Sequence, residues 1–322
     1  MKLAAKTTLK TLGDCAYQAI EKHFQKTIKW EKSVKKDEDP EALHQMRVGM
    51  RRLRTAVSRF SGSLYLPKSA SDKHIGKIAK ILGNLRDLDV LKASLENDYL
   101  PHLLPKEQHS LQTALSTLAK QREIALAQVQ KILKDDAYKS FKQSFQEWLE
   151  KPTYKSLASL PVQQVLPDLL LPEVSQLLLH PAWLIGTQIT DAQVMPSNGW
   201  TPEKVEENLK TEGESLHDLR KQAKRVRYQM ELFTELYSED FTQQIADVKN
   251  IQEILGTLQD SVVLHDWLIN VFKTETQNQL RGLVTLMISN RYKTWQEWQL
   301  IQTKYLKTET RQKFHLIILN PA

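Results

Sequence analysis

The stretch that decides the fold is LHQMRVGMRRLRTAVSRF, residues 43–60, because it recurs as LHDLRKQAKRVRYQMELF at 216–233. The two copies share leucine, histidine, phenylalanine and three arginine positions at a constant offset of 173 residues. A second block, ILGNLRDLDVL at 81–91, matches ILGTLQDSVVL at 254–264 with the same offset. Two separate motifs at one offset indicate an internal repeat of one helical unit.

The first copy has the periodicity of a helix with one apolar side and one basic side. On a wheel of about 100° per residue that starts at His44, the apolar residues fall between about 160° and 240°. Arg47, Arg51 and Arg54 fall between about 280° and 340°, whereas Arg52 falls near 80°. The second copy places basic residues at the same angles, so both helices are expected to carry a basic stripe.

Arginine dominates the stripe, and its planar, permanently charged guanidinium binds phosphate oxygens two at a time. The alternative is the solvated face of an amphipathic helix. Two copies weaken that alternative, because arginine-rich faces repel themselves and no Asp or Glu lies between Arg47 and Arg59. The candidate phosphate-binding residues are His44, Arg47, Arg51, Arg52, Arg54, His217, Arg220, Lys221, Lys224, Arg225 and Arg227.

A further basic row and the two histidines each have two interpretations. Lys73, Lys77 and Lys80 lie at i, i+4 and i+7, and either extend the anion-binding surface or form a solvated face. His44 and His217 serve either as phosphate ligands or in structural hydrogen bonds, and the sequence does not separate these roles. A metal site is not expected, because no second His or Cys follows either histidine at i+4.

The second block of the repeat also supplies candidate residues. Asp87 and Asp260 are expected to hold arginines by ion pairing or to cap a helix, in preference to forming a catalytic pair. Gly83 and Gly256 lie inside helical patterns, where they allow a close helix approach or a bend. Tyr228 falls on the basic side, where it either touches phosphate or packs.

Two arginines of each copy lie nearest the apolar side of the wheel, Arg47 and Arg54 in the first and Arg220 and Arg227 in the second. We expect these four side chains to be half-buried, with their donors directed into a groove. Arg59 lies one turn beyond the motif, and its counterpart in the second copy is Leu232. We therefore expect Arg59 to be a solvated surface group.

Glycine and proline are scarce and no segment alternates with period two, so the sequence predicts an all-α fold. The duplicated helical unit favours a pseudo-two-fold arrangement of the two halves. The proline-rich stretch 152–200 is the expected seam of one domain, 12–315, made of repeats at about 12–150 and 151–315. The short run 314–319 has no assignment. Helices are expected at 12–36, 40–60, 69–98, 106–134, 135–150, 162–180, 202–237, 240–272 and 275–305.

Composition narrows the class of protein. The formal net charge is +7, and the hydrophobic fraction of 41% indicates a globular chain. Cys15 is the only cysteine, which excludes an intrachain disulfide and fits a reducing compartment, so we expect a cytoplasmic protein. The most apolar stretch, 157–189, is broken by prolines and acids, so no membrane span and no membrane partner are expected.

The doubled H-x-x-R-x-x-x-[RK]-R-x-R helix, followed by L-G-x-L-x-D, resembles the CHAD family (conserved histidine α-helical domain). The resemblance covers about 12–315 and is strongest over 40–60, 78–92 and 214–265. It implies two helical bundles around a basic central groove, binding of inorganic polyphosphate and location at polyphosphate granules. It also implies that the candidate residues other than Lys221 line the polyphosphate site.

The resemblance has two further consequences. Lys224 stands where the first copy has Arg51, which keeps the charge and loses the bidentate fork. The chain has no E-x-E-x-K motif of the triphosphate tunnel enzymes that are fused to many family members. We therefore expect a stand-alone binding domain without catalysis or cofactor.

Two other functions compete with polyphosphate binding. An enzyme acting on a phosphoanhydride usually needs a carboxylate-held metal or a phosphate-cradling loop, and neither pattern occurs near the motifs. A nucleic-acid binder that stacks bases needs aromatic residues among the basic ones, and Tyr228 is the only aromatic residue in the stripes. Both are disfavoured, and the sequence indicates no protein partner.

Overall fold

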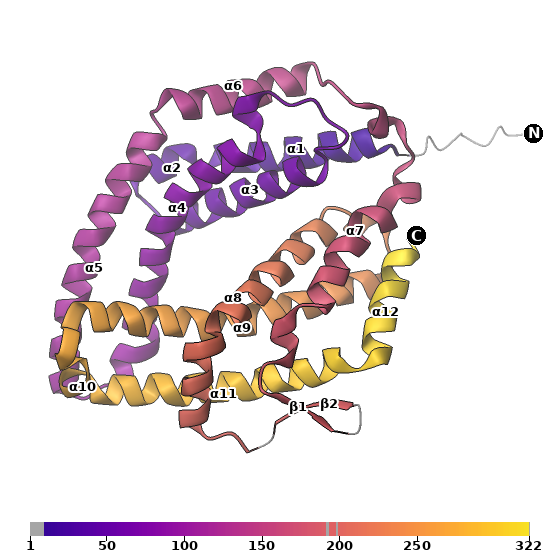
Figure 1. Ribbon diagram of the computed structural model, residues 1–322. Coiled ribbons are helices and arrows are strands. Elements are labelled where there is room, and N and C mark those ends of the chain that lie inside the picture. Colours follow the sequence, from indigo (N-terminus) through magenta and orange to yellow (C-terminus); the bar gives the residue numbers. More distant parts are fainter. Residues whose placement is uncertain (1–9, 191–192, 198, 322) are drawn as a thin grey trace, which may run out of the picture. The chain divides into compact units, whose positions relative to one another are not determined.

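The computed structural model describes residues 10–190, 193–197 and 199–321, and within them the protein is helical apart from a short two-stranded sheet (Figure 1). The expected all-α class is confirmed. None of the described helices is both long and apolar enough to cross a bilayer. The helices are α1 (Leu12–Lys29), α2 (Glu31–Lys36), α3 (Pro40–Arg59), α4 (Asp72–Ala93), α5 (Pro105–Ile132), α6 (Asp136–Glu150), α7 (Val162–Leu178), α8 (Pro202–Met230), α9 (Glu239–Phe272), α10 (Thr276–Gln279), α11 (Arg281–Leu306) and α12 (Thr308–Leu319).

Packing divides the chain into two compact units. The first unit consists of residues 10–87 and Arg122–Leu169, and the second unit consists of Leu88–Gln121 and residues 170–321. The helices α4, α5 and α7 each contain a boundary between the units. These units differ from the sequence repeats expected at 12–150 and 151–315, because residues 88–121 pack with the C-terminal part of the chain.

In the first unit, α1 packs along α3. The helix α3 begins where its sequence predicts, since the Asp39 side chain accepts a hydrogen bond of 2.8 Å from the Glu41 backbone N–H and Pro40 occupies the first helical position. The apolar side of α3, including Met46 and Met50, is fully buried. The basic side of the same helix is thereby fixed on the opposite side, toward solvent and toward α4.

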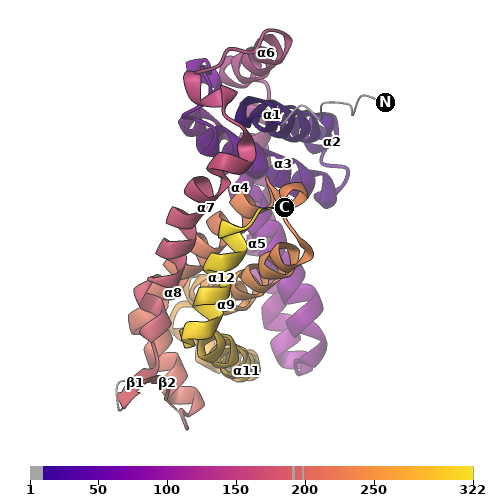
Figure 2. The same ribbon diagram turned by 90° about the vertical axis from the view of Figure 1, so that its right-hand side faces the viewer.

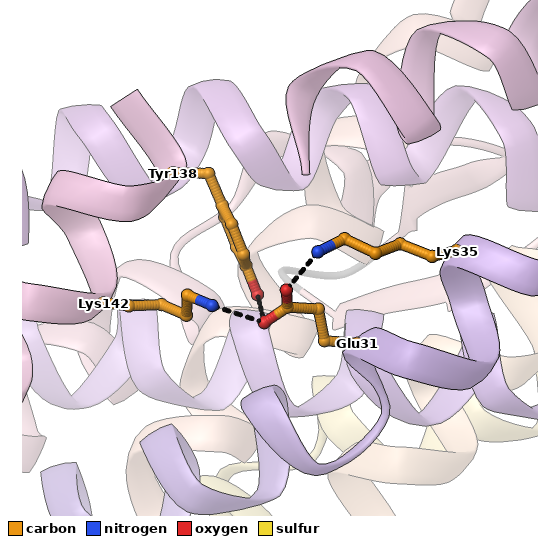
Figure 3. A network of polar contacts seen from close by, with 4 residues as sticks. All are labelled: Glu31, Lys35, Tyr138 and Lys142. Carbon is orange, nitrogen blue, oxygen red and sulfur yellow. Dashed lines mark hydrogen bonds and ion pairs between the residues drawn. The ribbon is translucent and has the colours of Figure 1, made fainter. Parts of the chain in front are cut away.

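A polar network joins α2 to α6 in the first unit (Figure 3). Glu31 accepts hydrogen bonds from the Tyr138 hydroxyl at 3.2 Å and from the Lys142 ammonium at 2.9 Å, and it also pairs with Lys35. Burial opposes ionisation of Glu31, but the hydrogen bonds from the two lysines prevail and lower the pKa of its carboxyl. Burial also raises the pKa of the Tyr138 hydroxyl, which therefore stays a donor.

In the second unit, α8 packs against α9 and α11, and Figures 1 and 2 show α12 beside α9. The segment 88–121 contributes Leu95, Leu111 and Leu118 to an apolar cluster with Leu264 and Leu283. This cluster explains why the segment belongs to the second unit.

A buried ion pair crosses the second unit between α8 and α11. The Arg291 side chain is 1% exposed and donates to both carboxylate oxygens of Glu206, each at 2.6 Å. It also donates to the Ser261 hydroxyl at 3.0 Å. A buried guanidinium needs this complete set of acceptors, because removing one leaves an uncompensated charge.

Two segments differ from expectation. The seam contains an antiparallel hairpin, β1 (Thr187–Thr190) and β2 (Gln193–Pro196), whose second strand packs on α11. The unassigned run 314–319 belongs to α12, which buries Phe314 and Ile318 on one side. The Tyr237 hydroxyl donates to the carbonyl of Ile318 at 3.0 Å and anchors that helix.

Candidate functional site

Arg47 of α3 lies across α4 in the first unit. Its Nη2 is 3.3 Å from Oδ1 of Asp87, and its side chain is 27% exposed. The guanidinium rests over Gly83, where a Cβ would lie 3.4 Å from Nη2. Gly83 thus gives the arginine room to lie against α4, and Asp87 holds its end.

The same arrangement recurs between α8 and α9 in the second unit. Arg220 Nη2 is 3.7 Å from Oδ1 of Asp260, and the Arg220 side chain is 23% exposed. A Cβ at Gly256 would lie 3.1 Å from Arg220 Nε and 3.2 Å from Nη2, closer than side chains ordinarily approach. The two aspartates therefore pair with arginines. The two glycines leave space for guanidinium groups, which is the role of close approach and not the bend that the sequence also allowed.

The next arginine position differs between the two units. Arg54 donates to both carboxylate oxygens of Asp72 on α4, at 2.8 and 3.1 Å, and is 48% exposed. Arg227 is 12% exposed, lies 3.5 Å from Glu231 one turn along its own helix, and covers the ring of Tyr228 at 4.4 Å. The expectation of half-buried arginines is confirmed for Arg47, Arg220 and Arg227, and Arg54 is more exposed.

Two of the predicted site residues face away from the stripe. Arg52 lies beside His23 of α1, and its charge helps burial to lower the pKa of His23 to about 4. Arg225 approaches Glu173 of α7 at 3.9 Å. This follows from their wheel angle of about 80°. The structure therefore separates Arg52 and Arg225 from the arginines that face α4 and α9, and Lys221 pairs with Asp218 on its own helix.

Arg59 is not the solvated surface group expected from the sequence. Its Nη1 donates a hydrogen bond of 2.7 Å to the backbone carbonyl of Leu169, and its side chain is partly buried. The expectation was wrong because the acceptor lies 110 residues further along the chain, where the wheel of one helix gives no information.

Both motif histidines are partly buried among positive charges. Burial lowers the pKa of His44, and Arg86 of α4 lowers it further. Burial also lowers the pKa of His217, with Lys221 and Arg220 adding to the effect. Within the described residues His217 Nδ1 makes no hydrogen bond, and the histidine lines a cavity of about 240 Å³ between α8 and α9. The structure does not show the structural hydrogen bond considered for His217.

Arg86 was not singled out from the sequence, although it lies in the second repeated block. Its counterpart there is Gln259, so comparison of the two copies gave no shared charge. The structure brings Arg86 near His44, which adds one more positive charge to the same surface.

The side chains of the site are mainly cationic in both units. Among residues 10–190, 193–197 and 199–321, no group of three or more His, Cys, Asp or Glu side chains is placed to hold a metal ion. The guanidinium groups of Arg47 and Arg220 are each held against a neighbouring helix by an aspartate. Held side chains lose less rotamer freedom when they bind a ligand.

Comparisons with known proteins agree on the fold. The family model of the CHAD domain matches residues 18–269. The crystal structure of the CHAD domain from the plant Ricinus communis is similar with a TM-score of 0.58 and 20% identity, over 99% of this chain and 96% of that chain. PptA from Streptomyces chartreusis has a TM-score of 0.62 and 14% identity, over 91% of this chain and 99% of that chain. At these identities the two structures show a shared fold alone, and a search of curated proteins found no match.

Proposed function

The chain belongs to the CHAD domain family, and from this premise we propose that it binds inorganic polyphosphate without catalysing a reaction. The observation that carries the proposal is the recurrence of one contact set in both units. Each unit has a motif arginine that lies over a glycine of the next helix and pairs with an aspartate there. Such held guanidinium groups suit a ligand made of repeated phosphates.

The proposal includes the arrangement expected from the sequence repeat. In it, the two motif helices are related by a pseudo-two-fold axis, and both basic stripes line one central groove. An experimental structure with the two stripes on opposite outer surfaces would contradict this part of the proposal. The proposed setting is the cytoplasm, at polyphosphate granules.

The salt dependence of binding tests the proposed function. A protein that neutralises phosphates releases counterions, so log affinity falls with log salt by roughly 0.7 to 0.9 per phosphate contacted. With about half of the eight or so motif arginines and lysines engaged, we expect a slope steeper than about −3. Binding isotherms with labelled polyphosphate over a series of KCl concentrations measure this slope, and a slope near zero would exclude the electrostatic mode.

The same preparation separates the two competing functions. Single-stranded RNA at matched phosphate concentration should compete poorly, because the stripes lack aromatic residues for base stacking. Incubation of polyphosphate with the protein and magnesium should release no phosphate above the protein-free control. Efficient RNA competition would favour a nucleic-acid binder, and phosphate release would favour an enzyme.

Binding should also strengthen as the pH falls, through His44 and His217. Their pKa values are lowered in the free protein, by burial first and then by nearby positive charges. A bound polyanion cancels those charges and raises both pKa values. The gain in affinity is then complete below the free-protein pKa and is lost as the pH rises through the bound-state pKa. Each rise of one pKa unit corresponds to about a tenfold gain in affinity.

Isotherms between pH 8 and pH 5.5 measure this effect. The matched variant His44→Gln/His217→Gln should bind with a flatter pH profile. The same polyphosphate is used in both series, so titration of the phosphate chain itself cancels in the comparison. An unchanged pH profile in the variant would assign the histidines a structural role.

A further inference from the structure

The two copies of the repeat carry opposite net charges. Residues 40–93 contain eleven Lys and Arg and four Asp and Glu, which gives a net charge of +7. The equivalent residues 213–266, at the offset of 173, contain six Lys and Arg and ten Asp and Glu, which gives −4. This difference in net charge comes from the residues around the motif, and the motif itself is basic in both copies.

Part of the difference is the lysine row of α4. Lys73, Lys77 and Lys80 are all exposed, and their counterparts on α9 are Ala246, Asn250 and Glu253. Among the residues that the structure describes, none forms an ion pair with these three lysines.

The lysine row borders the arginines of α3. On a wheel of α4 that starts at Lys73, the three lysines fall at about 0°, 40° and 340°, and Gly76 and Gly83 fall at about 300° and 280°. Gly76 and Gly83 are the positions over which Arg54 and Arg47 lie. The row extends about 10 Å along α4, next to the side of the helix over which Arg47 and Arg54 lie.

Motif arginines pair with acids in both units, Arg47 with Asp87 and Arg54 with Asp72 in the first, and the second copy adds two acids of its own. Asp218 pairs with Lys221, and Glu231 lies 3.5 Å from Arg227. The counterparts of these two acids in the first copy are Gln45 and Ser58, which carry no charge. A phosphate that approaches Arg227 has to compete with Glu231, whose carboxylate is already within ion-pair distance.

We infer that the first unit carries the principal polyphosphate-binding surface, formed by Arg47, Arg51, Arg54, Lys73, Lys77 and Lys80, and that the second unit contributes less. This inference rests on the proposed function. Screening limits the attraction of a polyanion to charges within about 10 Å at ordinary ionic strength, so the local charge of each unit decides where the chain binds. The net charge of the whole protein does not decide it.

Three variants of equal charge change test the inference. Lys73→Gln/Lys77→Gln/Lys80→Gln alters the first unit, and Arg220→Gln/Lys221→Gln/Lys224→Gln alters the second unit. Lys293→Gln/Lys307→Gln/Lys313→Gln removes three exposed charges from α11, α12 and the residue between them as a control for net charge. Polyphosphate binding is measured for each in a KCl series, with circular dichroism to confirm that the helices remain.

The first variant should make the salt slope shallower by about 2, near three contacts at 0.7 to 0.9 each, and weaken binding at 0.1 M salt by at least about tenfold. The second variant and the control should each change the slope by less than about 1. Equal or larger losses in the second variant, or a first variant no weaker than the control, would overturn the asymmetry while the proposed function stands. Failure of the unaltered protein to bind polyphosphate would overturn both.

Discussion

Replacing Arg47 with alanine is expected to weaken polyphosphate binding by about tenfold to a hundredfold, the equivalent of one charge-assisted hydrogen bond of roughly 1.5–3 kcal/mol. The side chain is held against α4 by Asp87 and Gly83, so its donors are positioned before the ligand arrives. Arg220→Ala tests the equivalent position in the second unit, where the surrounding acids should make the loss smaller. Isotherms for the two variants, at one salt concentration, measure the losses directly.

A suitable control for these variants is Lys313→Ala. Lys313 is exposed and lies 3.5 Å from the exposed Asp240, so its loss should change both stability and binding little. Arg59→Ala is unsuitable as a surface control, because Arg59 donates a hydrogen bond to the Leu169 carbonyl. If Lys313→Ala weakens binding as much as Arg47→Ala, overall charge alone explains the affinity, and the site proposed on α3 is wrong.

Replacing Glu206 with alanine is expected to lower the free energy of unfolding of the second unit by about 3–5 kcal/mol, because it leaves the buried Arg291 without its carboxylate partner. The remaining acceptor of that guanidinium, the Ser261 hydroxyl at 3.0 Å, is neutral and satisfies one donor. Urea unfolding followed by circular dichroism measures the loss.

Two further variants show whether the unpaired charge of Arg291 causes the loss of stability in Glu206→Ala. Glu206→Leu/Arg291→Met removes both charges and should recover much of the lost stability, since an apolar pair of similar volume often replaces a buried ion pair without cost. Lys304→Ala breaks the more exposed pair with Asp247 and should cost less than about 1 kcal/mol. A cost for Glu206→Ala as small as that of Lys304→Ala would contradict the assignment.

Local signals in the sequence predicted much of the helical structure. Asp39 and Pro40 gave the start of α3, and the apolar spacing gave its buried side, because both depend on residues within one helix. The expected helix 12–36 is instead two helices, and α2 ends at Asp37 in a left-handed conformation with φ of 55°. Arg122 donates to both carboxylate oxygens of Asp37, at 2.7 and 2.8 Å, from 85 residues away. Such distant contacts leave no periodic signal in the sequence.

The candidate site shows the same limit. The repeat singled out Asp87 and Asp260, because both copies carry them at one offset, and it left ion pairing and helix capping open; the structure pairs both with arginines. Asp72, the partner of Arg54, has no acidic counterpart in the second copy and was not predicted. The wheel placed Arg52 apart from the other arginines but did not say that α1 lies beside it. Which helix neighbours each side of α3 is decided by packing, which the sequence of α3 does not contain.

The boundaries of the two packing units make distant parts of the chain depend on one another for folding. The chain leaves the first unit within α4, returns within α5 and leaves again within α7. A fragment ending near residue 150 would keep Leu95, Leu111 and Leu118 but lose Leu264 and Leu283, against which they pack. These leucines would then face water, so a half-length polypeptide is expected to aggregate in preference to folding on its own. Each half of the sequence therefore needs the other half in order to fold, although each has its own copy of the motif.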